Sequence, residues 1–192
     1  VGSNIILGDN GEVNLNNLDE GDSNDVSTSE IHLGDDDVIV TRAGSNTILG
    51  GGGADRITLL DGVNTVVGDN GRVLRNHLEQ ITQVKSTDDG EGVAGADIIR
   101  SGGGVNVIIG GLGVDAGGLG DDIRVTGDGE NIILGDNGEV NLNNTAVGAS
   151  NDVKTTEIDF GDDDVILAGD GTNTILGGGG ADRITLGGGL NT

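Results

Sequence analysis

The sequence predicts an all-β fold, a parallel β-solenoid of about nine coils, and three observations support this. Glycine supplies 40 of the 192 residues, and Phe160 is the one aromatic residue, so a core of large rings is excluded. The other apolar residues are mainly Ile, Val and Leu, which favour strands. These aliphatic residues recur at intervals of nine, a regularity that disordered acidic chains lack. Abundant glycine and the absence of a 3.6-residue period argue against helices.

The chain contains a long internal repeat of 127 residues. Residues 1–65 align with residues 128–192 without a gap, so 1–127 is one super-repeat and 128–192 is a partial second copy. The motif GDNG occurs three times and divides the array into half-units of 60 and 67 residues. We assign the seven extra residues to an insertion, GVDAGGL, at 113–119. No linker interrupts the pattern, and we expect one continuous array over 1–192 that belongs to a longer one.

A shorter repeat of nine residues lies inside the long one, and its marker residue alternates between Asp and Asn. Two nonapeptides, 18 residues, then form one coil with an Asp edge and an Asn edge. Glycine-rich turns connect the short strands, and successive coils stack at roughly 4.8 Å. The Asp series is Asp37, Asp55, Asp97, Asp122, Asp164 and Asp182. The Asn series is Asn46, Asn64, Asn106, Asn131, Asn173 and Asn191.

Three stretches of the chain are longer than one 18-residue coil. Each runs for 24 residues from a valine after GDNG to an Asp of the series, at 13–37, 73–97 and 140–164. We interpret each as one enlarged coil whose Asn-side turn bulges outward, which places Val13, Val73 and Val140 at Asp positions. The alternative is that these stretches form hairpin arms. Near the insertion the alignment places Arg124 at an inward position, so we also expect a local shift of register there.

Two nonapeptides, GGGGADRIT at 50–58 and again at 177–185, fit the pattern G-G-x-G-x-D-x-U-x, where U is a large aliphatic residue. GVAGADIIR at 92–100 fits except at its second position. The chain thus resembles the hemolysin-type, or repeats-in-toxin (RTX), calcium-binding repeats. The resemblance implies a β-roll that holds Ca²⁺ between successive turns, with the aspartates and backbone carbonyl groups as ligands. It also implies a secreted bacterial protein.

The residue chemistry agrees with calcium, which prefers six to eight oxygen ligands. The candidate ligands are the six aspartates of the Asp series. A further set comprises the GDNG aspartates and the flanking members of two Asp triplets: Asp9, Asp69, Asp136, Asp36 and Asp163. The alternative is that these aspartates only accept hydrogen bonds from turn amides. The Asn edge brings no charge, and we expect a ladder of stacked amides there.

The formal net charge of −24 argues against nucleic acid and against anionic membrane surfaces as partners, and no apolar run is long enough for membrane insertion. The chain has only two histidines, no cysteine and no nucleophile motif. We therefore expect that it is not an enzyme. We therefore expect a calcium-binding, extracellular or cell-surface structural module, such as a stalk, fibre or surface-layer component, with further copies of the repeat as partners. The alternatives are an adhesin or ice-binding surface, and the calcium-triggered folding segment of a secreted enzyme or toxin.

Overall fold

The computed structural model describes residues 2–15, 24–89, 94–113, 120–143 and 151–192. These residues form 19 short strands in three sheets and contain no helix. No helix in this part of the chain is therefore long and apolar enough to cross a membrane. The all-β expectation is confirmed, and two of the three sheets are parallel.

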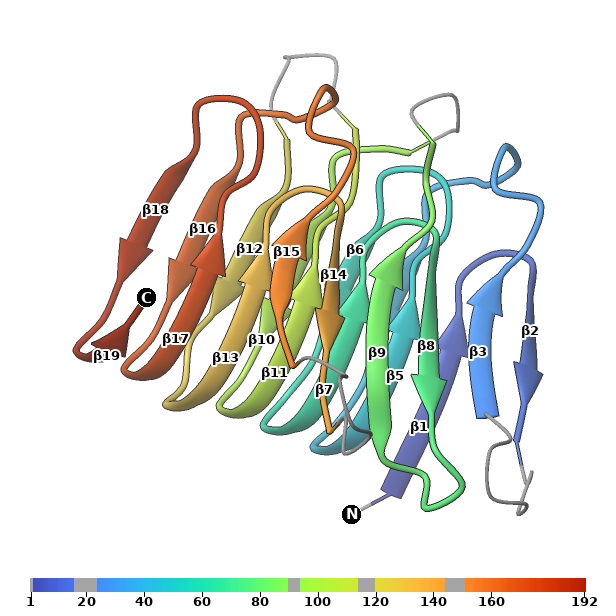
Figure 1. The fold of residues 1–192 in the computed structure, drawn as a ribbon, viewed down its shortest axis with the longest axis horizontal. Coiled ribbons are helices and arrows are strands. Elements are labelled where there is room, and N and C mark those ends of the chain that lie inside the picture. The colour runs from blue at the N-terminus through green and yellow to red at the C-terminus, as the bar shows by residue number, and fades with distance from the viewer. Residues whose placement is uncertain (1, 16–23, 90–93, 114–119, 144–150) are drawn as a thin grey trace.

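The middle layer is a parallel sheet, here called the central sheet (Figure 1). Its strands follow the order of the chain, and neighbours pair without a shift of register. The strands are β1 (Gly2–Leu7), β5 (Gly44–Leu49), β7 (Gly62–Val67), β11 (Gly104–Ile109), β13 (Gly129–Leu134), β17 (Gly171–Leu176) and β19 (Gly189–Asn191).

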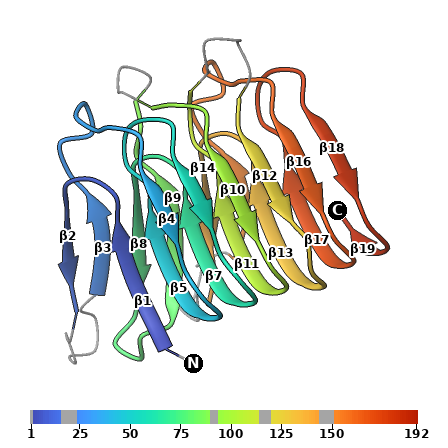
Figure 2. The same ribbon diagram turned by 180° about the vertical axis from the view of Figure 1, so that it is seen from behind.

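A second parallel sheet, the outer sheet, covers one face of the central sheet (Figure 2). Along the chain, each of its strands lies between two strands of the central sheet. The strands are β4 (Val38–Val40), β6 (Arg56–Thr58), β10 (Ile98–Ser101), β12 (Asp122–Val125), β16 (Val165–Ala168) and β18 (Arg183–Leu186).

The third layer is an antiparallel sheet built from three hairpins, here called the hairpin sheet. Each hairpin starts at the last glycine of a GDNG motif, and adjacent hairpins pair through β3 with β8 and through β9 with β14. The strands are β2 (Gly11–Asn14), β3 (Asn24–Thr28), β8 (Gly71–Arg75), β9 (Ile81–Ser86), β14 (Gly138–Asn141) and β15 (Val153–Thr155).

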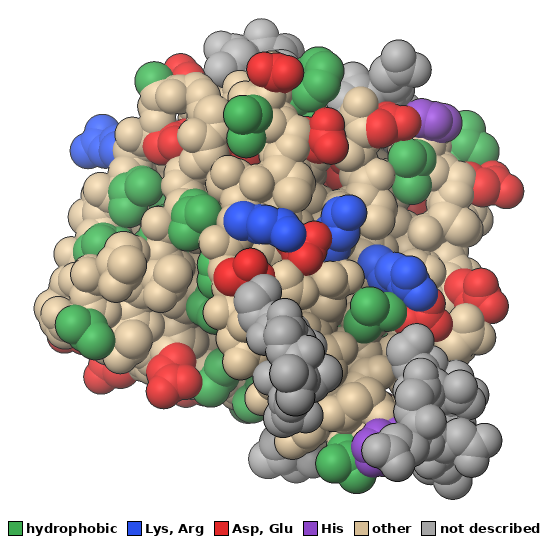
Figure 3. Space-filling view, viewed as in Figure 1, with side chains coloured by type: hydrophobic (Ala, Val, Ile, Leu, Met, Phe, Trp, Pro, Cys, Tyr) green, Lys and Arg blue, Asp and Glu red, His purple; other side chains and the backbone are tan. Residues whose placement is uncertain are grey.

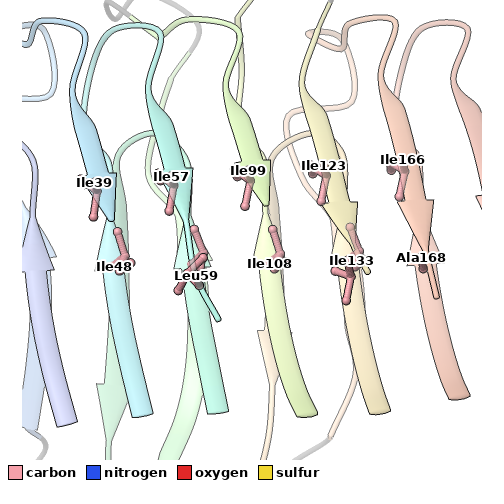
Figure 4. Packing of buried hydrophobic residues seen from close by; sticks show 12 residues of the cluster. Ile39, Ile48, Ile57, Leu59, Ile99, Ile108, Ile123, Ile133, Ile166 and Ala168 are labelled. Atoms are coloured by element: carbon pink, nitrogen blue, oxygen red, sulfur yellow. The ribbon is translucent and has the colours of Figure 1, made fainter. Parts of the chain in front are cut away.

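Side chains alternate along each central strand, and the sheet packs against a neighbouring sheet on each face. One face packs on the outer sheet, where Ile57, Ile99 and Ile123 stack in a row opposite Ile48, Ile108 and Ile133 (Figure 4). The other face packs on the valines of the hairpin sheet. This second cluster contains Leu49, Val67, Ile109 and Leu134 from the central sheet and Val26, Val73, Val84 and Val140 from the hairpins.

The interpretation of 13–37, 73–97 and 140–164 as enlarged coils is wrong. Val13, Val73 and Val140 lie in hairpin strands, and none occupies an Asp position. The hairpins also leave from the connections that lead into the Asp series, and not from the Asn side. Glycine at position 11 and its equivalents permits this, because an added Cβ would meet a carbonyl oxygen of the hairpin's returning strand, that of Ser27 in the first hairpin.

The expected count of nine coils fails for the same reason. Nine coils require nine strands in each parallel sheet, whereas in the described residues the central sheet has seven and the outer sheet six. Neighbouring asparagines of the central sheet are 18 residues apart where a plain connection joins them, and 42 apart where a hairpin intervenes.

The outward face of the hairpin sheet carries cross-strand ion pairs. Figure 3 shows basic side chains gathered over this sheet next to acidic ones. Arg72 Nη2 lies 2.8 Å from Asp25 Oδ2, and Lys154 Nζ lies 3.2 Å from Glu139 Oε1. These pairs orient the hairpins. They add little stability, because all four side chains are at least partly solvated.

Candidate metal centre

Six aspartates form a continuous hydrogen-bonded series, here called the Asp ladder, at the start of the outer strands. The backbone N–H of each aspartate donates to Oδ1 of the next one along the stack. The five N···O distances, from Asp37 to Asp182, are 2.7, 2.7, 2.7, 2.8 and 3.2 Å. The members are Asp37, Asp55, Asp97, Asp121, Asp164 and Asp182.

The structure places Asp121, and not the predicted Asp122, in this ladder. Asp97 and Asp121 are 24 residues apart, against 18 for Asp37 and Asp55, so six of the seven extra residues precede Asp121. The seventh lies between Asp121 and Asn131, since Asn106 and Asn131 are 25 residues apart, against 18 for Asn46 and Asn64. Asp122 instead pairs in register with Ile98, and its Oδ2 lies 3.7 Å from Arg100 Nη2 on the outward face. The expected register shift is confirmed, since Ile123 is fully buried and Arg124 is exposed. Residues 114–119 of the predicted insertion lie outside the described residues.

The second carboxylate oxygen of the ladder aspartates faces a space that exists because a glycine has no side chain. A Cβ added to Gly50 would collide with Asp55 Oδ2 and with the carbonyl oxygen of Gly68. The same pairing of one carboxylate oxygen with one glycine carbonyl recurs along the stack. The glycines concerned are Gly8, Gly50, Gly68, Gly110 and Gly135, facing Oδ2 of Asp37, Asp55, Asp97, Asp121 and Asp164 respectively.

Three of these carboxylate oxygens are buried without any hydrogen-bond partner: Oδ2 of Asp55, Asp97 and Asp164. Burying an ionised oxygen without a partner is strongly unfavourable, and a cation supplies what is missing. Carboxylate and carbonyl oxygens are also the ligands that calcium prefers. The residues therefore fit Ca²⁺, which when bound would neutralise the carboxylates. Within the described residues, no group of three or more His, Cys, Asp or Glu side chains is placed to hold a metal, so a ladder site combines carboxylate with carbonyl oxygens.

The pKa values of the ladder aspartates also favour a bound cation. Burial, reinforced by neighbouring carboxylates, raises the pKa of Asp55 to about 7 and that of Asp164 to about 8. The pKa values of Asp97 and Asp121 lie well above their usual range, again because of burial and then of a neighbouring ladder aspartate. Without a cation the ladder aspartates are thus driven to take up protons.

The aspartates of the GDNG motifs each accept hydrogen bonds from turn amides. Asp69 accepts from the backbone N–H groups of Gly95 and Leu112, and Asp136 accepts from those of Asp162 and Gly179. Asp9 Oδ2 accepts from the N–H of Gly52 at 2.8 Å. These carboxylates bridge one connection to the next through turn amides, which was the alternative interpretation of the sequence.

Asp36 and Asp163 also accept backbone hydrogen bonds and are exposed. Asp36 Oδ1 accepts from Ala54 N at 2.9 Å, and Asp163 Oδ1 accepts from Ala181 N at 2.7 Å. Both lie next to a ladder aspartate in the sequence.

The amide ladder expected on the Asn side is confirmed and is longer than the sequence indicated. The Nδ2 group of each asparagine donates to Oδ1 of the next at 2.7–2.9 Å, and Asn4 precedes the six predicted members. Asn106 is fully buried and also donates to the carbonyl of Gly102 at 3.2 Å. Hydrogen bonds between neutral groups satisfy this side of the stack, so it needs no cation.

Comparison with protein families agrees with this geometry. The family described as "RTX calcium-binding nonapeptide repeat (4 copies)" matches residues 33–66, 86–116 and 159–192, together just over half of the chain. The chain belongs to this family. Curated proteins and solved structures gave no match. In the RTX chain, the matched segments contain five of the six ladder aspartates. The sixth, Asp121, lies beyond the end of the second segment.

Replacing one ladder aspartate should raise the calcium requirement of the RTX chain. In Asp97→Asn the remaining Oδ1 still accepts from Asp55 N, but the unpartnered charged oxygen is lost. We expect the calcium concentration at half-maximal folding to rise about tenfold, because calcium affinity depends on the number of charged ligands. Circular dichroism during calcium titration measures this. Asp122→Asn is the matched control, and an equal rise in that variant would contradict the assignment.

The calcium-free protein should become less stable as pH rises. Folded Asp55 and Asp164 have pKa values of about 7 and about 8, against an ordinary value of 3.8, so between these limits the folded state binds more protons than the unfolded state. Stability in metal-stripped buffer is therefore highest below the ordinary value and is lost as pH rises through about 8. Urea unfolding across this range tests the prediction, and stability that increased with pH would refute it.

Introducing a charge into the amide ladder should be strongly destabilising. Asn106→Asp removes the donations to Asn131 and Gly102 and buries a carboxylate, so we expect a loss of about 3 kcal/mol or more in the free energy of unfolding at neutral pH. The loss should shrink at acidic pH, where the carboxyl group is protonated. Asn191→Asp, at an exposed position of the same ladder, is the control and should change stability much less. Equal losses in both variants would show that burial of the amide is unimportant.

Proposed function

We propose that this RTX chain is a structural module whose folding depends on calcium bound along the Asp ladder. The observation that supports this most directly is the row of buried, unpartnered Oδ2 atoms, each beside a glycine carbonyl oxygen. The net charge of −24 adds to it, because a compact state with so many carboxylates repels itself unless cations are bound.

In this proposal the two parallel sheets are the walls of a β-solenoid, the β-roll implied by the family. An ion between successive connections would be coordinated by carboxylates of the stack, and its charge would cancel their repulsion. Metal binding and folding then form one equilibrium, since the glycine spaces exist only when neighbouring connections are stacked.

The proposed setting is outside the cell, where calcium reaches the millimolar range that weak extracellular sites need. Membership of the RTX family supports secretion from a bacterium. The proposed role is that of a spacer in a stalk, fibre or surface layer, with further copies of the repeat as neighbours. We propose no catalytic activity for this segment, because its carboxylates recur along the stack as a scaffold's do, and no binding of nucleic acid.

Calcium titration followed by circular dichroism tests the proposal. Metal-stripped protein at neutral pH should lack most of its strand signal, millimolar calcium should restore it cooperatively, and excess chelator should reverse the change. Magnesium at the same concentration is the control, and we expect it to be much less effective because it demands a smaller octahedral site. A strand signal that is unchanged between chelator and calcium would rule out calcium-dependent folding.

A further inference from the structure

A second group of buried oxygens lies where the middle hairpin meets the next GDNG motif. Thr87 and Asp88 follow β9, and Asn137 precedes β14. Asp88 is 5% exposed and Asn137 is fully buried. Three oxygens here are buried with no hydrogen-bond partner: Thr87 Oγ1, Asp88 Oδ2 and Asn137 Oδ1.

The surrounding hydrogen bonds hold these residues together and leave those oxygens unused. Asn137 Nδ2 donates to the carbonyl of Asp88 at 3.5 Å, and Gly138 N donates to Ser86 Oγ at 2.9 Å. On the other side, Asn70 Nδ2 donates to Asp88 Oδ1 at 3.0 Å, and Thr87 N donates to the carbonyl of Asn70. The side-chain amide groups of Asn70 and Asn137 therefore already donate to other oxygens, and not to these three.

We propose that Thr87, Asp88 and Asn137 form a calcium site separate from the Asp ladder. The three free oxygens are a hydroxyl, a carboxylate and an amide oxygen, all hard ligands of the kind that calcium takes. The Thr87 hydroxyl can donate to only one of the other two oxygens, whereas one cation ligated by all three would satisfy them together. This site is additional to the ladder sites of the proposed function.

The charges around Asp88 favour a cation there. Asp88 raises the pKa values of both Asp69 and Asp97, after the larger effect of burial, so its charge acts on two other buried carboxylates. Burial also raises the pKa of Asp88 itself to about 6, with the hydrogen bonds from Asn70 opposing the rise. A divalent ion at this position would link the end of the middle hairpin to the following one and relieve the repulsion.

The other hairpins do not repeat this arrangement. The residues equivalent to Asp88 are Glu30 and Glu157, as shown by the matching bonds of Ser29 with Asn10 and of Thr156 with Asn137. Both glutamates are exposed and have positive φ angles of 54° and 51°. Their carbonyls accept from Leu33 N and Phe160 N, which closes a different turn. The site is thus specific to the middle hairpin, and Glu157 offers a matched control.

Counting bound ions in the 192-residue chain tests this inference. Metal-stripped protein at neutral pH is titrated with calcium by calorimetry, and a second sample is loaded with ¹¹³Cd²⁺ for NMR. We expect Asp88→Asn to bind one ion fewer than the unchanged protein and to lose one cadmium resonance. Thr87→Val should keep the fold and weaken one site, whereas Glu157→Gln should match the unchanged protein.

Three outcomes decide the matter. If Asp88→Asn and Thr87→Val bind as many ions as tightly as the unchanged protein, the site does not exist. If Asp88→Asn instead becomes more stable in chelator with no change in ion number, Asp88 is a protonated acid that donates to Asn137, and the inference fails. Asp97→Asn distinguishes this failure from failure of the proposed function, since it should weaken one ladder site and leave the site at Asp88 unchanged. An unchanged protein that binds no calcium overturns both.

Discussion

Repulsion between carboxylates stacked in a low-dielectric environment is the constraint on which the rest of this structure depends. The Asp ladder places them on successive outer strands, roughly one strand spacing apart. The four inner members are buried, so water cannot screen them: Asp55, Asp97, Asp121 and Asp164. The backbone N–H groups satisfy only one oxygen of each carboxylate. Protons or cations would relieve this repulsion, and a glycine carbonyl oxygen adjoins each glycine space beside Oδ2.

Neutral amides solve the equivalent problem on the other side of the stack. An asparagine both donates and accepts, so the chain from Asn4 to Asn191 is satisfied without an ion. An aspartate only accepts when ionised. An NH₂ group in place of a carboxylate oxygen thus separates a side whose hydrogen bonds are complete from one that leaves buried carboxylate oxygens without a partner.

Local periodicity was enough to predict these two ladders, since a marker every nine residues places Asp55 and Asn64 on opposite sides. It was not enough to predict how far each repeat extends. Asp121 and Asp122 are adjacent carboxylates, and the alignment selected Asp122, although the D-x-U order of the motif favours Asp121, two residues before Ile123. The pairing of Ile123 with Ile99 agrees with Asp121. Val13 and Val73 follow the aliphatic pattern of a stacked strand equally well in a hairpin, because both environments bury one face. The hydrogen bonds that Asp69 accepts likewise come from amides 26 and 43 positions further along, which a local pattern cannot reveal.

The hairpins also alter how the chain reaches its folded state. Strands β5 and β7 are joined by a short connection, whereas β7 and β11 can pair only after a segment that contains β8 and β9 has been accommodated. The entropy lost in closing a loop grows with its length, by about 0.6 kcal/mol for each doubling. Because β8 and β9 pair with each other within a few residues, a hairpin formed first shortens the effective loop nearly to that of a plain connection. The hairpins therefore lengthen the polypeptide between stacked strands without a matching delay in the pairing of those strands. Each hairpin is a local starting point for assembly of the layers around it.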